Sequence, residues 1–506
     1  MIKVIPTVKE STMKQHKISI LASCCGELFP CAQRTLKDYI KFLYNLELEA
    51  ASSKEAGISF RLDSTLTEEE YKLNIDNAQV IVFAATEAGA LNAVSTLVQL
   101  LERVGDSFSI QVGSIRDYPD CEWRGMMIDV SRTWHEISRL YRYIDACRFF
   151  KVKYLHIHFT DDASYTLPCE CFPKLPTADR HYTKEEIIGL IEYAKLRGVE
   201  LVPELDIPGH SSLFNYTYSD IFGHADSIQT SIISLSEISL QGIEAILKEL
   251  CELFKDSKYI HIGGDEANIE VWLKSKESIE TIRKTGVDVD SMDKETLKQY
   301  MWAYFEKRAS EMILSMGKTP IVWEGFSSSY NSMISRDVVV MSFENYYQIV
   351  PDLLKDGFRI LNTSWIPMYI VAPTHYWSEK EIFEWDTYKW TAFHPKSPYK
   401  DKVLQVEPTQ LIEGGHLLSW TDNLYLYYQD NLNGVKINQE LVEARLSCLA
   451  ENTWNREKSL TWEEFSNRKK VVDGLHMKLQ NKMDEDNRGS NLECFYIRNN
   501  IKGEQV

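Results

Sequence analysis

The stretch Tyr259-Ile260-His261-Ile262-Gly263-Gly264-Asp265-Glu266-Ala267 is an apolar strand that ends in two glycines and two neighbouring carboxylates. Side chains alternate between the faces of a regular strand, so Asp265 and Glu266 could not face one pocket if the strand simply continued. Gly263 and Gly264 lack a Cβ and let the backbone turn sharply, which can aim both acids at one bound molecule. A polar turn after a buried strand is the simpler interpretation. If both acids do face one pocket, we expect one to stay protonated as a general acid and the other to be anionic.

A repeated strand-and-helix pattern surrounds this stretch from residue 118 onward. Thr183 opens one of the intervening helices with a capping sequence, and Gly198 ends it. Eight such units in about 340 residues predict an α/β fold, the (β/α)8 TIM barrel, whose chemistry lies at the carboxyl ends of the strands. The expected strands are residues 123–130, 154–159, 200–205, 259–262, 320–323, 338–343, 358–362 and 415–419.

The first 117 residues follow a different pattern. Strand patterns at 17–21, 58–62 and 80–84 alternate with helical patterns at 32–46 and 88–104, without a phosphate-binding glycine loop. They predict a small α/β domain with a packing role. We therefore expect an N-terminal α/β domain at 1–117, a catalytic barrel at 118–480, and a C-terminal tail at 481–506 that packs on the barrel or extends from it.

The amino-acid composition restricts the classes of binding partner to be expected. The 506 residues are 44% hydrophobic and 26% charged, with a formal net charge of −18, and no run is long enough to span a bilayer. This acidic balance disfavours nucleic acid and anionic membrane as partners, and no membrane insertion is expected. The N-terminus lacks an apolar signal region, so a cytoplasmic protein is expected if Met1 is the native start. The ten cysteines lack paired ligand spacing, and reduced, mostly buried thiols are expected.

Polar residues cluster at the expected strand ends in an ordered set of motifs. The set, which covers roughly residues 60 to 455, resembles glycoside hydrolase family 20, the β-N-acetylhexosaminidases. Its early motifs are Arg124-Gly125-x-x-x-Asp129-x-x-Arg132, His156-x-His158-x-x-Asp161-Asp162, Pro203-Glu204-x-Asp206-x-Pro208-Gly209-His210 and His261-x-Gly263-Gly264-Asp265-Glu266. Later similarities are Val322-Trp323-Glu324-Gly325, Trp365 with Tyr369, Gly414-Gly415 with Trp420, and Arg445-Leu446, Ala450-Glu451 and Trp454.

The resemblance implies a retaining exo-hydrolase of terminal β-linked GlcNAc or GalNAc that needs no cofactor. The substrate's own acetamido oxygen attacks the anomeric carbon and forms an oxazolinium intermediate. Glu266 would be the general acid and base, and anionic Asp265 would hold the acetamido N–H. Tyr369 would donate a hydrogen bond to the acetamido oxygen.

The resemblance also implies how the sugar is held. Trp323, Trp420 and Phe343 would wall the acetamido methyl pocket, and Trp365 is a further candidate beside them. Arg124 would bind the O3 and O4 hydroxyls. Asp161 and His210 would support the acid, and the substrate would be an oligosaccharide or glycoconjugate.

Two positions depart from the family pattern. Val371 stands where the family often has Asp or Asn two residues after the tyrosine, so one polar contact near the acetamido group is missing or comes from elsewhere. Asp422 replaces a common Glu two residues after the late tryptophan. Its side chain is shorter by one methylene, which should change how O4 and O6 are held.

Two alternative functions stay open on the sequence. His156 and His158 lie on one face of a strand, as zinc ligands do in metal-dependent barrel hydrolases. The barrel could also be an inactive carbohydrate-binding module, since a fold alone does not establish activity. The aglycone would be selected by loops such as 267–293 and 372–402.

Overall fold

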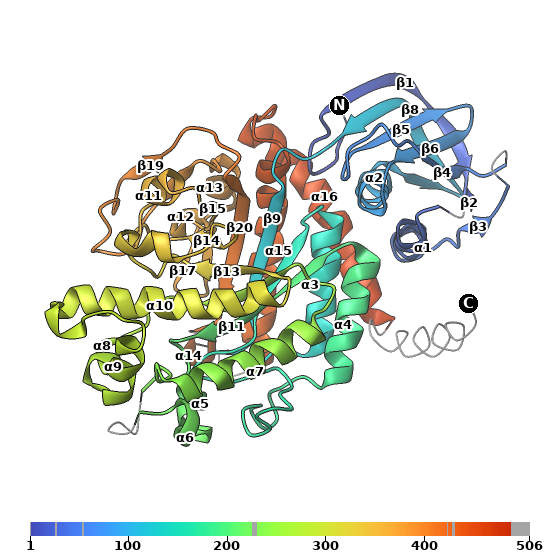
Figure 1. Cartoon of the computed structure of the whole chain (residues 1–506). Coiled ribbons are helices and arrows are strands. Elements are labelled where there is room, and N and C mark those ends of the chain that lie inside the picture. Colours follow the sequence, from blue (N-terminus) through green and yellow to red (C-terminus); the bar gives the residue numbers. More distant parts are fainter. Residues whose placement is uncertain are drawn as a thin grey trace.

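The computed structural model describes residues 2–25, 28–52, 55–224, 230–422, 424–427 and 431–486. Figure 1 shows an N-terminal domain, in blue, beside a larger barrel. The sheet of the first domain ends at Asp117, and the first barrel strand begins at Trp123. None of the described helices is both long enough and apolar enough to cross a membrane.

The larger domain is a closed barrel of eight parallel strands. Its strands follow the order β9-β10-β11-β12-β13-β14-β15-β20, and β20 pairs with both β15 and β9 to close the circle. This confirms the predicted TIM barrel. The strands are β9 (Trp123–Asp129), β10 (Tyr154–His158), β11 (Glu200–Ile207), β12 (Tyr259–Gly263), β13 (Thr319–Trp323), β14 (Val339–Ser342), β15 (Arg359–Asn362) and β20 (Ile412–Trp420).

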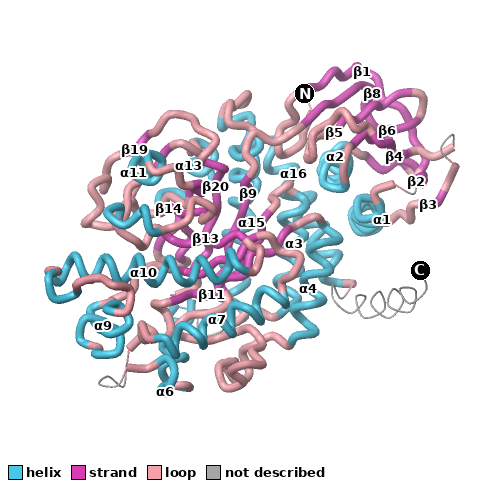
Figure 2. The backbone as a smooth tube through the Cα atoms, viewed as in Figure 1, coloured by secondary structure: helices cyan, strands magenta, loops and turns pink. Residues whose placement is uncertain are grey.

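Helices surround these strands, as the cyan ring around the magenta centre in Figure 2 shows. Thr183 and Glu186 form the predicted capping box of α4, and Gly198 ends this helix in the left-handed conformation (φ 61°). The outer helices are α3 (Ile137–Phe149), α4 (Lys184–Arg197), α7 (Glu237–Leu253), α10 (Lys294–Ser315), α11 (Val350–Lys355), α15 (Asn431–Trp454) and α16 (Trp462–Glu485).

The loops between barrel units carry short elements of their own. Those before α10 are α5 (Ser212–Thr217), α6 (Ser219–Phe222), α8 (Glu270–Lys274), α9 (Lys276–Arg283) and η1 (Val289–Ser291). Those after β13 are η2 (Ser328–Met333), α12 (Trp365–Met368), β16 (Tyr369–Val371), β17 (His375–Tyr376), α13 (Glu379–Glu384), β18 (Lys389–Thr391), β19 (Val403–Gln405) and α14 (Leu424–Tyr427). Strand β16 pairs with the far end of β20, which brings residue 369 to the mouth of the barrel.

The N-terminal domain is a mixed sheet with two helices. The strand order is β1-β8-β5-β6-β4-β2-β3, with β7 paired to β8. The helix expected at 88–104 is shorter: α2 ends at Leu100, and the next residues form β7 because they pair with β8. The elements are β1 (Glu10–Leu21), β2 (Ser23–Cys25), α1 (Pro30–Tyr44), β3 (Glu49–Ala50), β4 (Ile58–Leu62), β5 (Tyr71–Asp76), β6 (Gln79–Ala84), α2 (Glu87–Leu100), β7 (Glu102–Val104) and β8 (Ser107–Asp117).

Buried polar contacts join the two domains. Asp117, the last residue of β8, accepts hydrogen bonds from Lys151 Nζ at 2.8 Å and from Trp454 Nε1 at 2.9 Å, both on the barrel side. Helix α1 also packs against α16. Of the expected C-terminal tail, 481–486 include the end of α16, and 487–506 lie outside the described residues.

Candidate active site

The turn after β12 places the two neighbouring acids in different surroundings. Gly263 (φ 71°) and Gly264 (φ 98°) both adopt left-handed conformations that favour glycine. A Cβ would also overlap the carboxyl group of Asp206 at the first position and that of Glu306 at the second. After this turn Asp265 is only 8% exposed, whereas the side chain of Glu266 is 64% exposed.

Asp265 is a buried carboxyl group with one oxygen free. Its Oδ1 has no hydrogen-bond partner among the residues that the structure describes. Burial, together with the charge of Glu266 and against that of His210, raises the pKa of Asp265 to about 6. The group is therefore mostly anionic at pH 7, and its free oxygen can accept a hydrogen bond from a ligand N–H.

A chain of polar contacts runs from Glu266 through His210 to Asp161. His210 Nε2 lies 3.8 Å from Glu266 Oε2, and His210 Nδ1 lies 3.2 Å from Asp161 Oδ2. Burial would lower the pKa of His210, but the charges of Asp206, Asp161 and Asp265 hold it well above its usual value, so the imidazole is a cation. The structure thus brings Asp161 and His210 together with Glu266.

Four aromatic rings form a closed cycle at the mouth of the barrel. They are Trp323 at the end of β13, Phe343 directly after β14, Tyr369 on β16 and Trp420 at the end of β20. Each ring neighbours the next, with centroid separations of 5.7, 6.3, 6.2 and 6.0 Å around the cycle. Such a frame presents apolar ring faces to a small group held between them.

Tyr369 connects this cycle to the acids. Burial, and then the charges of Glu344 and Asp265, raise the pKa of Tyr369 well above 10, so its hydroxyl keeps a proton to donate. Trp365 stands behind it with a centroid separation of 4.0 Å. Val371 lies on the same short strand, opposite Trp420 in the β16–β20 register, and is buried.

Arg124 does not lie with these residues. It is at the start of β9, 1% exposed, and ion-paired with Glu69 of the N-terminal domain. The other end of the strand is five residues, or about 16 Å, away. The expectation that Arg124 binds sugar hydroxyls is therefore wrong, because its guanidinium is engaged at the opposite end of the barrel.

Arg132 occupies the position that Arg124 was expected to fill. Its guanidinium forms ion pairs with Asp129 (3.2 Å), Asp161 (2.6 Å) and Asp422 (3.1 Å), just beyond the end of β9. It also lies 5.0 Å from the ring centroid of Trp420. The same motif contains both arginines, and the rule that chemistry lies at carboxyl strand ends would have selected Arg132.

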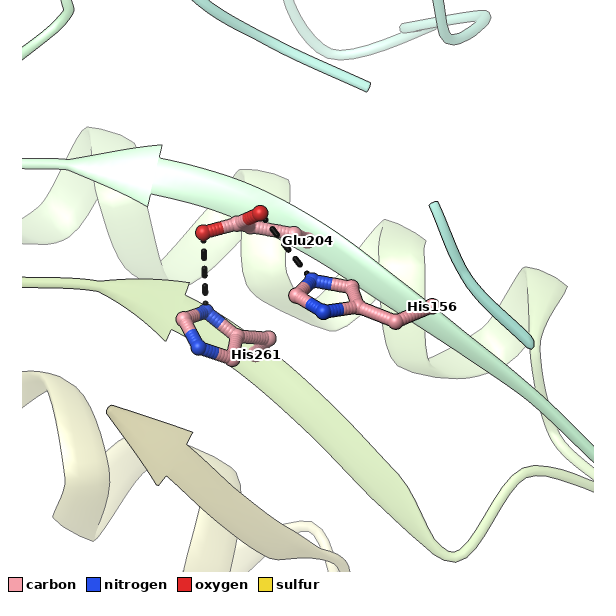
Figure 3. A group of neighbouring side chains, drawn as sticks. All are labelled: His156, Glu204 and His261. Atoms are coloured by element: carbon pink, nitrogen blue, oxygen red, sulfur yellow. Dashed lines mark hydrogen bonds and ion pairs between the residues drawn. The ribbon is translucent and has the colours of Figure 1, made fainter. Parts of the chain in front are cut away.

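Below the acids, one buried carboxylate gathers three histidines and a tryptophan. Glu204 lies at ion-pair distance from His156 Nε2 (3.0 Å) and His261 Nδ1 (2.9 Å), as Figure 3 shows. It also contacts His158 Nδ1 at 2.5 Å and accepts a hydrogen bond from Trp323 Nε1 at 2.9 Å. The sequence motif includes Glu204, but its partners come from three other strands and were not foreseen.

This buried group bears on the zinc alternative. His156, Glu204 and His261 offer ligand atoms within 4.8 Å of one another. All three are fully buried, whereas a catalytic zinc needs an open position for water or substrate. The imidazole nitrogens of His156 and His158 that face Glu204 already bond to it. The geometry therefore favours histidines that orient Glu204 and Asp161 over metal ligands.

Comparison with known families gives this arrangement a context. Residues 121–457 match the family described as Glycosyl hydrolase family 20, catalytic domain, and residues 1–118 match Glycosyl hydrolase family 20, domain 2. The chain belongs to glycosyl hydrolase family 20. Membership covers both domains, so the resemblance inferred from the strand-end motifs is confirmed.

Family 20 relatives of this chain include curated proteins and solved structures. The chain is similar to the β-hexosaminidase of Vibrio furnissii, with 28% identity over 72% of this chain and 62% of that protein. The fold matches an exo-β-N-acetylglucosaminidase from Vibrio harveyi (TM-score 0.78, 21% identity, 95% of this chain and 78% of that one). It also matches a β-N-acetylhexosaminidase from Bacteroides fragilis (TM-score 0.77, 22% identity, 94% and 96%). The matched region thus spans less than two thirds of the Vibrio furnissii protein.

Proposed function

We propose that this chain is an exo-acting β-N-acetylhexosaminidase that hydrolyses terminal β-linked N-acetylhexosamine with retention of configuration. The observation that carries the proposal is the placing of Asp265, with its free buried oxygen, beside the aromatic cycle that Tyr369 completes. A carboxylate acceptor, a hydroxyl donor and an apolar frame match the N–H, the oxygen and the methyl group of an acetamido substituent. The family's relatives named β-hexosaminidase support the same substrate class.

In the proposed first step, the acetamido oxygen of the substrate attacks the anomeric carbon. The bond to the leaving oxygen breaks as Glu266 transfers its proton to that oxygen. Asp265 accepts the acetamido N–H and stabilises the positive charge that the oxazolinium develops. Tyr369 holds the acetamido oxygen in line for the attack.

In the proposed second step, the Glu266 carboxylate removes a proton from water as that water attacks the anomeric carbon. The oxazolinium ring opens and restores the acetamido group, and two inversions give overall retention. The exposed position of Glu266 leaves room for the leaving group and then for water. Cationic His210, 3.8 Å away, stabilises the carboxylate between the steps.

A panel of aryl β-glycosides of GlcNAc, GalNAc and glucose, assayed with and without EDTA, tests this proposal. We expect turnover of the N-acetylated substrates only, because the glucoside carries no nucleophile, and we expect activity to survive EDTA. Comparable glucoside turnover would contradict the mechanism. Loss of activity on chelation that Zn²⁺ restores would favour a metal-dependent hydrolase, and no turnover of any substrate would favour a binding module.

Inhibition gives an independent check of the proposed intermediate. A thiazoline that mimics the oxazolinium ring should inhibit competitively and bind more tightly than the substrate, because it presents the intermediate to Asp265 and Tyr369. An inhibition constant no lower than the KM of the substrate would speak against this intermediate.

A further inference from the structure

Two thiols and a carboxylate meet beside α7, away from the strand-end residues described above. Cys169 and Cys171 lie in the segment that joins β10 to α4, and Glu249 lies on α7. Cys169 Sγ and Cys171 Sγ are 3.6 Å apart. One ligand atom from each of the three side chains lies within 4.8 Å of the other two.

We propose that Cys169, Cys171 and Glu249 bind a thiophilic divalent cation of the zinc class. Two thiolates on a tetrahedral zinc lie about 3.8 Å apart, since each Zn–S bond is about 2.3 Å, and the two sulfurs already have this spacing. Cys169 is buried and Cys171 is exposed, so the fourth position opens to solvent and a water molecule occupies it. Each thiol loses its proton on binding, which releases two protons per ion.

Backbone hydrogen bonds hold Glu249 beside the Cys-x-Cys segment before any ion binds. The two oxygens of Glu249 accept hydrogen bonds from the backbone N–H groups of Glu170 (2.6 Å) and Cys171 (3.0 Å). Each oxygen keeps a second lone pair that a cation can use. Glu170, the residue between the two cysteines, also forms an exposed ion pair with Lys184, with 2.6 Å between Lys184 Nζ and its carboxylate.

Glu249 is the proposed ligand that the spacing of residues in the sequence does not identify. The Cys-x-Cys spacing alone gives two ligands, and the third is 78 residues further along the chain. A bound cation would link the segment after β10 to α7 by metal bonds. Because only the folded chain brings Glu249 to the two thiolates, it should bind the ion more tightly than the unfolded chain, and the melting temperature should rise with the ion concentration.

Titration of the reduced, chelator-treated full-length protein with Cd²⁺ tests the site, since cadmium thiolates absorb in the ultraviolet. We expect one Cd²⁺ per chain, displacement by Zn²⁺, release of about two protons per ion, and a higher melting temperature in Zn²⁺. Absence of the cadmium–thiolate absorption band, or a titration that does not end at one Cd²⁺ per chain, would overturn the proposal. A reduced protein that retains no ion, while Cys169 and Cys171 form a disulfide in air, would overturn it as well.

Substitutions locate the ion. Cys171→Ser changes an exposed side chain and should weaken Cd²⁺ binding more than tenfold, because even residues that only support a ligand are worth about 10–100-fold in affinity. Glu249→Gln should weaken binding without removing the absorption band. Cys25→Ser, at a partly exposed thiol of the N-terminal domain, is the matched control and should bind as the wild type does. Unchanged binding in Cys171→Ser would place the ion elsewhere and refute the site.

Discussion

At the residue scale, the raised pKa of Asp265 predicts the acid side of the pH profile. In the proposed mechanism, Asp265 must be anionic to stabilise the oxazolinium, and burial raises its pKa from 3.8 to about 6. Because the group becomes neutral as the pH falls below that value, kcat/KM should drop about tenfold per pH unit below pH 6. Asp265→Asn should lower the rate and remove this limb. An unchanged limb in Asp265→Asn, measured with a nitrophenyl substrate, would assign it to another group.

Arg124, on β9, and Arg132, just beyond the end of β9, allow a matched comparison. Arg132→Lys keeps the charge but loses the planar fork, and should lower kcat/KM about tenfold or more, since a hydrogen bond to a charged group contributes about 1.5–3 kcal/mol. Arg124→Lys should lower the melting temperature through its contact with Glu69 and leave kcat/KM unchanged. Steady-state kinetics and thermal unfolding of both variants decide this. A loss of kcat/KM in Arg124→Lys alone would contradict the positions described here.

At the element scale, Trp365, just before β16, and Phe393, in the loop after β16, add two rings to the aromatic cycle. Trp365 lies against Tyr369 at a tilt of 35° and stacks on Phe393, with a centroid separation of 5.2 Å and an interplanar angle of 21°. Phe393 is 41% exposed, so we expect its ring to contact the sugar on the leaving-group side of the proposed substrate. The loop is held because Glu344 accepts the backbone N–H groups of Phe393 and His394 at 2.7 and 2.8 Å.

Phe393→Ala should therefore raise the KM for an N-acetylglucosamine disaccharide by up to about tenfold, because an aromatic stacking contact contributes about 0.5–1.5 kcal/mol. The kcat should change little, since the reacting atoms do not touch Phe393. Tyr376→Ala, at another exposed ring of the same loop, is the control. An equal rise in KM in both variants would indicate a general disturbance of the loop.

The elements that could be predicted from the sequence are those set by local patterns. The eight barrel strands follow from buried apolar runs, and α4 follows from Thr183 and Gly198, because capping residues act within a few positions. Strand β7 was missed because its pairing with β8, rather than its own sequence, makes it a strand. Glu204 could be seen in its motif, but its contacts with His156, His158 and His261 depend on two other strands, β10 and β12.

At the scale of the whole molecule, the two domains are joined by buried charges. Lys151 and Asp117 are fully buried, with 2.8 Å between Lys151 Nζ and Asp117 Oδ2, so removing either charge leaves the other as a buried charge without its ion-pair partner. Asp117→Asn should destabilise the protein by about 3–5 kcal/mol, and both domains should unfold in one transition. Glu102→Gln, at the exposed pair with Lys17, is the control and should leave the melting temperature nearly unchanged. Scanning calorimetry that shows two separate transitions would contradict the coupling.

Arg124 and Arg132 show that two residues of one sequence motif can lie at opposite ends of the barrel. The sequence puts Arg124 and Arg132 in one motif, and only the direction of β9 in the barrel distinguishes the arginine at the domain interface from the one beside Asp161. The positions of Asp265, Glu266, Trp323, Phe343, Tyr369 and Trp420 could be predicted because each comes at or just after a predicted strand end or, for Tyr369, matches a family residue. The sequence places Arg132 with Asp129 at the end of an expected strand, but the resemblance alone gave the sugar-binding role to Arg124.

The central claim, that the two neighbouring acids have unequal roles, is tested most directly by the kinetics of Glu266→Gln on two leaving groups. The variant lacks the proton donor, so kcat/KM for a disaccharide should fall by about 10²–10⁴, the usual contribution of general acid catalysis. The nitrophenolate group of a nitrophenyl N-acetylglucosaminide can leave without a proton. The rate of the first step with this substrate should therefore fall much less. Equal losses on both substrates, or a covalent sugar adduct on Glu266 or Asp265 in mass spectrometry, would contradict the account.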